Sequence, residues 1–417
     1  MATSEIVVLV KLSLVGVIRA KWRLRRYSVV ILCTSNAVCD RGPACLLPPI
    51  RPASRSVCGA PCPHPRAKRH QSTQVAFITV HTTFSEITTM RLGGPAGEYE
   101  VAHSSEQLIA LIRDADAQGK PVLVVGGGSN LIVGDQGFDG LVVGVATSGL
   151  SIDGEFVRVQ AGVDWDTVVA ASLEAGLGGL EALSGIPGSA GGTPVQNVGA
   201  YGTLTSDVLH DVTVFDRESG VVERWSRDRC GFGSHRQSAF KHTDRYVILD
   251  VSFRLTADTR SRPIRYSGLA ERLGVEIGDV ASTDEVRGAV LSLRRERGML
   301  LDEENHDTWS VGSFFINPVL AVVPEKAHQA PQYPDPAGIK LPAAWLIEHS
   351  GFSRGYGQDW GNGKVALSTK HTLAVTNRGG ATTADVMKFA AHIRDGVETE
   401  FGVRLGPECR LVNCQFG

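Results

Sequence analysis

Two glycine-rich stretches carry the residues whose types and spacing point most directly to chemistry. The first, Gly126–Asn130 (GGGSN), follows the apolar run Val122–Val125. Its bare backbone amides and short polar side chains are typical of a concave site for phosphate oxygens. Leu131 stands where the Rossmann pattern G-x-G-x-x-G needs its third glycine, which argues against that loop. Taken alone, the stretch is also compatible with an ordinary tight turn.

The second stretch is longer and more specific. Residues 179–202 contain seven glycines, punctuated by Ile186, Val195 and Val198. A flexible linker would lack such apolar residues, so we expect a folded loop. Its backbone N–H groups can hold a pyrophosphate, and Gln196 and Asn197 can hydrogen-bond the edge of a heteroaromatic ring.

Capping signals predict the elements that position these stretches. Helices are expected after Ser104 up to Gly119, from Asp164 to about Gly176, from Ser282 to Arg297, and after Thr382. Strands are expected over 122–125, 131–133, 212–216 and 246–255, where apolar and β-branched residues gather. This order of mixed elements predicts an α+β fold with two major lobes.

Composition argues against several classes of function. The 417 residues include 42 basic and 44 acidic side chains, and a net charge of −2 gives no chain-wide case for nucleic-acid binding. No run of about 18 apolar residues is present, so we expect no membrane insertion. Twelve histidines form no H-E-x-x-H pair, and we expect no metal site.

Residues 1–74 differ from the rest of the chain. They hold 12 basic and two acidic residues and five of the eight cysteines. We expect this segment to be a disordered extension, or upstream sequence read from too early a start codon. Only Cys230, Cys409 and Cys414 remain in the body, which predicts a reduced, cytoplasmic protein without a disulfide framework.

Seven ordered motifs between about Thr82 and Arg410 resemble the UDP-N-acetylenolpyruvoylglucosamine reductase family. They are TTMRLGGPA (88–96), VLVVGGGSNLIV (122–133), the 179–202 block, RQSAFK (236–241), WSVGSFFINP (309–318), STKHTLAVTNRG (368–379) and GPECRL (406–411). The resemblance implies an FAD-binding lobe of the vanillyl-alcohol-oxidase type over residues 75–260 and a C-terminal α+β substrate-binding lobe over 261–417.

The same resemblance implies an enzyme of peptidoglycan precursor synthesis. It would use FAD and the co-substrate NADPH to reduce UDP-N-acetyl-3-O-(1-carboxyvinyl)-glucosamine to UDP-N-acetylmuramate, as a cytoplasmic monomer. Three residues match the family's catalytic set: Arg236 for the substrate carboxylate, Ser313 as proton donor, and Glu408 working with the arginine. Hydride addition to the vinyl carbon drives negative charge toward the carboxylate, which a guanidinium can stabilise.

The resemblance also assigns the remaining contacts. The predicted cofactor-binding residues are Gly126, Gly127, Gly128, Ser129, Asn130, Gly188, Gly191, Gln196, Asn197, Gly199 and Tyr201. The predicted substrate-binding residues are Arg297, Asn317, Tyr333 and Arg354. Two departures stand out: Arg297 replaces a usual lysine, and the chain is one residue longer around His235.

Two other functions are alternatives to this reductase activity. A flavin-dependent oxidase of alcohols or hydroxy acids would have no use for Ser313 or the Tyr333 loop. A binding protein for nucleotide sugars without catalysis would be expected to lose Arg236, Ser313 or Glu408, and all three are present.

Overall fold

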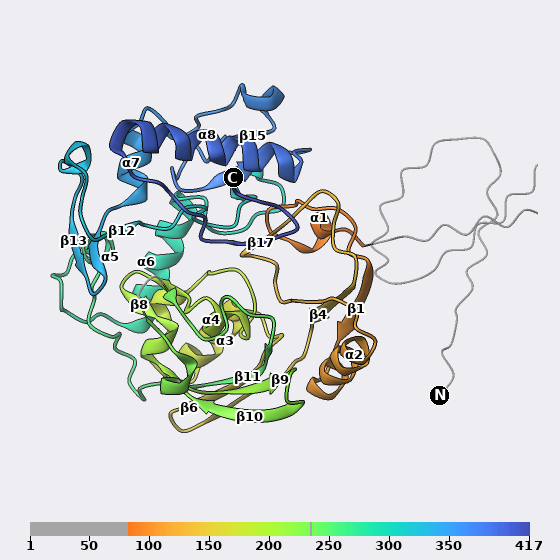
Figure 1. The fold of residues 1–417 in the computed structure, drawn as a ribbon. Coiled ribbons are helices and arrows are strands. Elements are labelled where there is room, and N and C mark those ends of the chain that lie inside the picture. The colour runs from red at the N-terminus through yellow and green to blue at the C-terminus, as the bar shows by residue number, and fades with distance from the viewer. Residues whose placement is uncertain (1–81, 234–235) are drawn as a thin grey trace, which may run out of the picture. The chain divides into compact units, whose positions relative to one another are not determined.

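The computed structural model describes residues 82–233 and 236–417, which belong to one structural unit of residues 81–417 (Figure 1). The predicted extension over residues 1–74 and the longer chain at His235 lie outside the described residues. The predicted boundary between the lobes at residue 260 stays a prediction. We call residues 82–260 the N-terminal lobe and residues 261–417 the C-terminal lobe.

Capping side chains begin the long helices, as the sequence predicts. The Ser104 hydroxyl accepts a hydrogen bond from the Gln107 N–H at 3.2 Å, and Thr382 and Asp385 form a reciprocal capping box. The helices span α1 (Phe84–Ile87), α2 (Ser105–Ala117), α3 (Trp165–Glu174), α4 (Gly192–Val195), α5 (Ser267–Leu273), α6 (Thr283–Glu296), α7 (Ala343–His349) and α8 (Thr383–Phe401).

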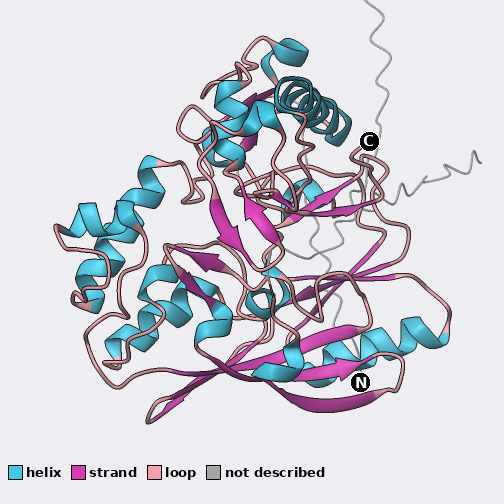
Figure 2. Cartoon of the chain, turned by 60° about the vertical axis from the view of Figure 1, so that its left-hand side comes forward, coloured by secondary structure: helices cyan, strands magenta, loops and turns pink. Residues whose placement is uncertain are grey.

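Strands occur both between these helices and in successive runs, such as β2 to β6, and Figure 2 shows them gathered in sheets. They are β1 (Glu98–Ala102), β2 (Val122–Val125), β3 (Leu131–Val133), β4 (Leu141–Val145), β5 (Leu150–Asp153), β6 (Phe156–Gln160), β7 (Gly199–Ala200), β8 (Thr203–Leu204), β9 (Leu209–Asp216), β10 (Val221–Ser226), β11 (Tyr246–Arg254), β12 (Val319–Leu320), β13 (Tyr333–Asp335), β14 (Gly338–Lys340), β15 (Val365–Leu367), β16 (Val375–Asn377) and β17 (Arg410–Val412). The observed elements confirm the α+β class and every helix and strand predicted above, with ends that agree to within about two residues except that β9 begins three residues before the predicted 212–216.

Two sheets build the N-terminal lobe. A parallel sheet has the order β1-β4-β2, and an antiparallel sheet has the order β10-β9-β11-β6-β5. Helix α2 places Leu108 and Ile112 in a buried cluster with Val143 of the first sheet and Phe215 of the second. Helix α3 packs Trp165 against the antiparallel sheet, where its ring lies 5.5 Å from that of Phe253. The first glycine stretch follows β2, an edge strand of the parallel sheet, and the second follows α3.

The C-terminal lobe has its own core, around α7, α8 and the β15–β16 pair. Phe389 and Ile393 of α8 are fully buried there, together with Met90 and Leu92 from the N-terminal lobe. Figure 1 shows α7 and α8 on the side of this unit opposite the antiparallel sheet. A small antiparallel sheet of order β12-β14-β13 belongs to the same lobe.

The last strand of the chain returns to the N-terminal lobe. Strand β17 pairs in parallel with β3, so that Arg410 lies beside Leu131. The Arg410 N–H donates to the Asn130 carbonyl at 2.9 Å, directly after the first glycine segment. The fold thus pairs the GPECRL motif, near residue 410, with the VLVVGGGSNLIV motif of residues 122–133. No helix among the described residues is long and apolar enough to cross a membrane.

Candidate active site

The first glycine segment, Gly126–Asn130, is the turn between β2 and β3 and leads into a strand, as predicted. Gly128 adopts φ = +63°, and its carbonyl accepts a hydrogen bond from the Thr89 N–H at 3.2 Å. A Cβ atom on Gly128 would lie 2.9 Å from Thr88 Cα. Both the positive φ and the close backbone approach therefore require glycine.

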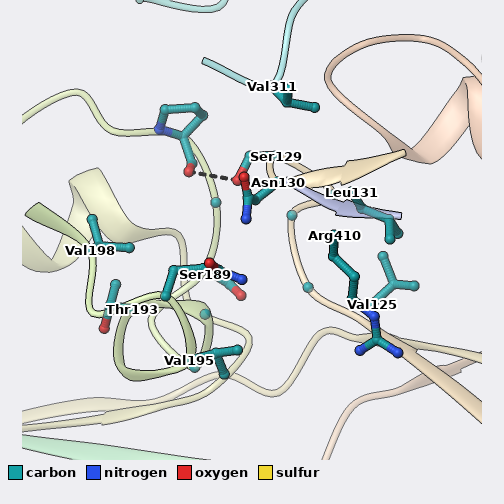
Figure 3. A pocket seen from close by; sticks show the side chains of 18 of the residues that line it. Val125, Ser129, Asn130, Leu131, Ser189, Thr193, Val195, Val198, Val311 and Arg410 are labelled. Carbon is teal, nitrogen blue, oxygen red and sulfur yellow. Dashed lines mark hydrogen bonds between the residues drawn. The ribbon is translucent and has the colours of Figure 1, made fainter. Parts of the chain in front are cut away.

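The second glycine segment, Ile186–Gly192, meets the first one backbone to backbone. A Cβ atom on Gly127 would lie 2.7 Å from Gly188 Cα, closer than real Cβ atoms approach. The Ser129 hydroxyl donates to the Pro187 carbonyl at 2.9 Å, which is the dashed bond in Figure 3. The two segments therefore form one structure, which we call the glycine cradle.

The glycine cradle borders a cavity of about 380 Å³. Figure 3 shows Ser129 and Asn130 on one side and Ser189, Thr193 and Val195 on the other, with Val311 approaching from the C-terminal lobe. Strand β2, residues Tyr246–Ile248 of β11 and residues 310–313 complete much of the wall. A volume of this size is typical of small-molecule and cofactor sites.

The charges of the wall suit a bound diphosphate. Of the described residues that line the cavity, only Asp244 and Glu408 are acidic. Each is ion-paired with an arginine of the same wall, Asp244 with Arg410 and Glu408 with Arg236, both at 2.5 Å. The wall therefore has more arginines than acidic residues. This excess of positive charge, together with the glycine N–H groups, fits the diphosphate of FAD, and the apolar strand β2 suits its ring systems.

Arg236 reaches the cavity from a strained backbone position. Its φ is +56°, which is uncommon for a residue with a side chain. Its guanidinium donates to Glu408 Oε1 at 2.5 Å and to the Gly199 carbonyl at 3.0 Å. The Arg236 side chain is 43% exposed and that of Glu408 is 16% exposed, so the pair lies at the rim of the cavity.

Backbone pairing places Ser313 beside the segment that carries Glu408. The Glu408 N–H donates to the Phe314 carbonyl at 2.7 Å, and the Ile316 N–H donates to the Gly406 carbonyl at 3.0 Å. Phe314 is fully buried in the C-terminal core, which anchors this segment. The structure therefore brings Arg236, Ser313 and Glu408 to the wall of one cavity.

Most predicted cofactor residues line that cavity, and two do not. Gly126, Gly127, Gly128, Ser129, Asn130, Gly188, Gly191, Gln196 and Gly199 are all part of its wall. Asn197 is buried, and its side-chain oxygen accepts a hydrogen bond from the Ser206 N–H at 3.0 Å. Tyr201 packs edge-on against Tyr266, and burial raises the pKa of its hydroxyl. The structure gives these two side chains packing partners away from the wall.

The predicted substrate residues also lie outside the wall. Arg297 donates to the Tyr266 hydroxyl at 2.9 Å, and the Asn317 side chain accepts from the Ala343 N–H at the start of α7. Tyr333 lies in β13 and is 51% exposed. Arg354 is exposed in the turns that follow α7.

Three arginines of the wall were not predicted from the sequence: Arg217, Arg294 and Arg410. Arg217 is ion-paired with Asp116 at 2.6 Å. Arg410 is the arginine of the GPECRL motif, two residues after Glu408, so its motif already contained the signal. Arg294 lies in the last turn of α6, three residues before Arg297, and only its burial distinguishes it from its neighbours. Lys241 also lies near the rim: burial lowers the pKa of its amine, and the charge of Glu408 opposes that shift.

Two family models match the chain. The one described as FAD binding domain matches residues 99–226, and the one described as UDP-N-acetylenolpyruvoylglucosamine reductase, C-terminal domain, matches residues 303–412. The first range contains both segments of the glycine cradle. The second contains Ser313 and Glu408.

Curated relatives named UDP-N-acetylenolpyruvoylglucosamine reductase align over most of the chain. That of Nocardia farcinica is 49% identical over 344 residues, covering 80% of this chain and 89% of the relative. That of Thermobifida fusca is 50% identical over 339 residues, covering 77% and 94%. The solved structure of the Thermus caldophilus enzyme of that name is 23% identical and superposes with a TM-score of 0.55 over 80% of this chain and 98% of that one. This likeness supports the shared fold.

Proposed function

Because the chain belongs to the UDP-N-acetylenolpyruvoylglucosamine reductase family, we propose that Arg236, Ser313 and Glu408 carry its reaction in the cavity described above. The family's enzymes contain FAD and reduce the enolpyruvyl group of a UDP-linked amino sugar. The product, UDP-N-acetylmuramate, is a precursor of peptidoglycan. The observation that carries the residue assignment is the meeting of these three side chains with the glycine cradle at one cavity.

The glycine cradle would hold the diphosphate of FAD through its backbone N–H groups. Ser129 already uses its hydroxyl on the Pro187 carbonyl, so its contribution to a ligand would come from its N–H group and hydroxyl oxygen. When bound, FAD would take a hydride from NADPH and deliver it to the vinyl carbon of the substrate. Asn197 and Tyr201 would act by holding the loop that carries Gln196 and Gly199 in place.

Arg236 and Glu408 would prepare the substrate carboxylate. The free N–H groups of the Arg236 guanidinium can bind the carboxylate, where negative charge develops as the double bond is reduced. Glu408 fixes the orientation of Arg236 through the 2.5 Å ion pair. Their partial exposure keeps the pair accessible to a substrate that enters from outside.

Ser313 would donate the proton that completes the reduction. Its Oγ–H can transfer to the carbon next to the substrate carboxylate, and the pairing of residues 314–316 with 406–408 fixes its position. Arg236 and Arg294 line the same cavity as Ser313, and their positive charges would favour the alkoxide left after proton transfer.

Arg297, Arg354, Asn317 and Tyr333 would bind the nucleotide sugar outside the cavity. One observation supports this for the two arginines: burial, together with the charges of Arg297 and Arg354, lowers the pKa of His371 to about 4, against the charge of Glu348. The charges of both arginines therefore act on the His371 imidazole. Positive charges of this kind suit the diphosphate of a UDP-sugar.

We propose that the protein works in the cytoplasm as a monomer, with an FAD-binding domain over residues 75–260 and a substrate-binding domain over 261–417.

Purified protein tests the function directly. It should show the absorbance of oxidised flavin and should lose that absorbance when NADPH is added without oxygen. Addition of the enolpyruvyl UDP-sugar should then restore it. A protein that binds FAD but is not reoxidised by this substrate would contradict the proposed reaction. One reduced equally well by NADH would contradict the choice of NADPH.

A further inference from the structure

The segment that carries Ser313 has no regular secondary structure of its own. It follows a short 3₁₀ turn, His306–Thr308, and in the described part of the chain residues 309–313 belong to no helix or strand. Thr308 and residues 310–313 line the cavity. Without the hydrogen bonds of a helix or a sheet, this segment is fixed by the contacts that neighbouring residues make with it. The position of Ser313 therefore depends on those contacts.

The loop between β15 and β16, residues 368–374, contacts both ends of this segment. At one end, the Phe314 N–H donates to the Leu373 carbonyl at 2.8 Å. At the other end, the Asp307 carboxylate accepts a hydrogen bond from the Thr369 N–H at 2.9 Å and one from each of the Ser368 and Thr369 hydroxyls at 3.0 Å. Asp307 is therefore the side chain through which the β15–β16 loop holds the start of the segment.

Asp307 is buried, and its carboxylate is fully hydrogen-bonded. Its side chain is 8% exposed, and Arg378 Nη1 donates to its Oδ1 at 2.8 Å. With this ion pair, each carboxylate oxygen accepts two hydrogen bonds. Charge-assisted bonds of this kind are stronger than neutral ones, and loss of the carboxylate would leave Arg378 and three other donors without their acceptor. Asp307 lies behind the cavity wall and is not itself part of it.

The same carboxylate also orders the β15–β16 loop. While the Ser368 hydroxyl donates to Asp307, its oxygen accepts from the N–H groups of Lys370 at 3.1 Å and His371 at 3.3 Å. The N–H group of the residue after Arg354 donates to the Ser368 carbonyl at 3.1 Å. Arg354 is one of the residues proposed above for the nucleotide sugar. Asp307 thus connects the segment of the proposed proton donor with the loop beside the proposed sugar site.

We propose that Asp307 is a positioning residue, which fixes Ser313 in the cavity wall relative to the β15–β16 loop. This inference rests on the proposed roles of Ser313 and Arg354. Because one carboxylate binds both segments, the proton donor and the bound sugar keep a constant relative position. Such a constraint matters because a displacement of about 1 Å at the reacting groups can slow a reaction by about 10²-fold.

The test compares Asp307→Ala with Asp135→Ala in the FAD-loaded full chain. Asp135 also holds a distant segment through its carboxylate, which accepts from the N–H groups of Thr383 at 2.7 Å and Ala384 at 3.0 Å at the start of α8. Asp135 lies away from the cavity wall. The bound flavin is photoreduced without NADPH, and its reoxidation by the enolpyruvyl UDP-sugar is followed by stopped-flow absorbance. The comparison separates displacement of Ser313 from a general loss of stability.

Asp307→Ala should slow this reoxidation by about 10- to 100-fold. Asp135→Ala should leave the rate unchanged even where it lowers the Tm. Asp307→Asn should recover most of the rate, because its side-chain oxygen can accept from the Thr369 N–H and its NH₂ group can donate to the two hydroxyl oxygens. In a Ser313→Ala background, Asp307→Ala should slow reoxidation no further, since no positioned proton donor is left to displace.

Amide hydrogen exchange gives a second readout, which does not depend on the reaction. Asp307→Ala should speed exchange in peptides that cover residues 308–316 and 368–374, whereas Asp135→Ala should speed it at the start of α8. A wild-type protein that the sugar does not reoxidise would contradict the proposed function. The exchange measurement would then still decide whether Asp307 holds the segment of Ser313.

Three results would overturn the proposal. The first is unchanged reoxidation in Asp307→Ala, or equal slowing in Asp135→Ala. The second is an equal slowing by Asp307→Ala with and without Ser313, which would show that Asp307 acts independently of the proton donor. The third is unchanged exchange over residues 308–316. If Asp307→Ala does not retain FAD, Thr369→Val, which removes one hydroxyl donor and keeps the carboxylate, decides on the same criteria with a smaller expected effect.

Discussion

The glycine cradle and the rim of the same cavity, formed by Arg236, Ser313 and Glu408, are held together by different kinds of contact. In the cradle, backbone meets backbone, as where Gly127 faces Gly188, and the Ser129 hydroxyl adds one hydrogen bond to the Pro187 carbonyl. At the rim, Arg236, Ser313 and Glu408 come from three distant segments, and side-chain and cross-segment contacts define the geometry. The cradle should therefore be sensitive to added atoms and tolerant of changes in charge. The rim should show the reverse.

The largest effect is expected at the rim, for Ser313→Ala. Reoxidation of the flavin by the sugar substrate should slow by about 10²- to 10⁴-fold, because a positioned proton donor contributes on that order. Reduction by NADPH, which needs no proton on the sugar, should stay near the wild-type rate. Stopped-flow absorbance separates the two halves. Ser313→Cys should recover part of the rate, and equal slowing of both halves would make Ser313 a structural residue.

The next effect is expected in the cradle, for Gly127→Ala. The added Cβ would meet Gly188 Cα at 2.7 Å and force the two segments apart. Overpacking of this kind costs about 1–3 kcal/mol, which predicts FAD binding weaker by about 5- to 150-fold. Fluorescence titration of the apoprotein with FAD measures it. Gly288→Ala in α6, where a Cβ meets no atom within 4 Å, is the matched control and should bind FAD normally. Wild-type affinity in Gly127→Ala would show that the cradle is not rigid.

A smaller effect is expected for the coupling between Arg236 and Glu408. Each single change, Arg236→Met or Glu408→Gln, should lower kcat/KM, and the double variant should lose less than the two losses combined. Because Arg236 is nearly half exposed, solvent screens the pair, and we expect a coupling of about 1 kcal/mol, roughly fivefold. Additive losses would mean that Glu408 does not act through Arg236.

The smallest effect concerns the outer support of the cradle, Asp166, which accepts a hydrogen bond from the Gly185 N–H at 2.7 Å. Hydrogen bonds from Arg287 hold the pKa of Asp166 below its ordinary value. The folded-state pKa of Asp166 lies below its unfolded-state pKa of about 3.9. The pair therefore contributes its full stabilisation of the fold above the unfolded-state pKa, and this contribution is lost as the pH falls through the folded-state pKa. Asp166→Asn should lower the Tm by about 2 °C or less at neutral pH. The difference from wild type should shrink below about pH 4 in thermal melts, whereas a difference that grew in acid would contradict this origin.

The difference between the cradle and the rim also explains which parts of the site could be predicted from the sequence. The cradle needs glycine at positions close together in the chain, so Gly126–Asn130 and the 179–202 block could be found by composition and spacing alone. The helices were predictable because Ser104, Ser282 and Thr382 cap them locally. Arg236, Ser313 and Glu408 carry no local signal, and only the family resemblance identified them.

Some site residues were assigned wrongly or overlooked because the direction of their side chains could not be predicted from the sequence. Asn197 follows Gln196, yet its φ of +38° turns it to the Ser206 N–H and away from the cavity. Arg294 and Arg297 lie one turn apart in or next to α6, yet one lines the cavity and the other bonds Tyr266. No spacing rule distinguishes such neighbours, because the deciding contacts come from the Gly185 and Met299 carbonyls, which accept from Arg294, and from Tyr266, and these are distant in the chain or set by a loop.

The pairing of β3 with β17 determines how late in synthesis β3 gains its strand partner. Within the part of the chain that the structure describes, β3 has no other strand neighbour, and β17 is made about 280 residues later. At about 5–20 residues per second, a ribosome needs roughly 15–55 s to cover that distance. Until then the nascent chain has the glycine cradle but lacks the strand that holds one of its edges and the Glu408 beside it. The glycine cradle therefore gains this supporting edge only after residues 410–412 have been synthesised.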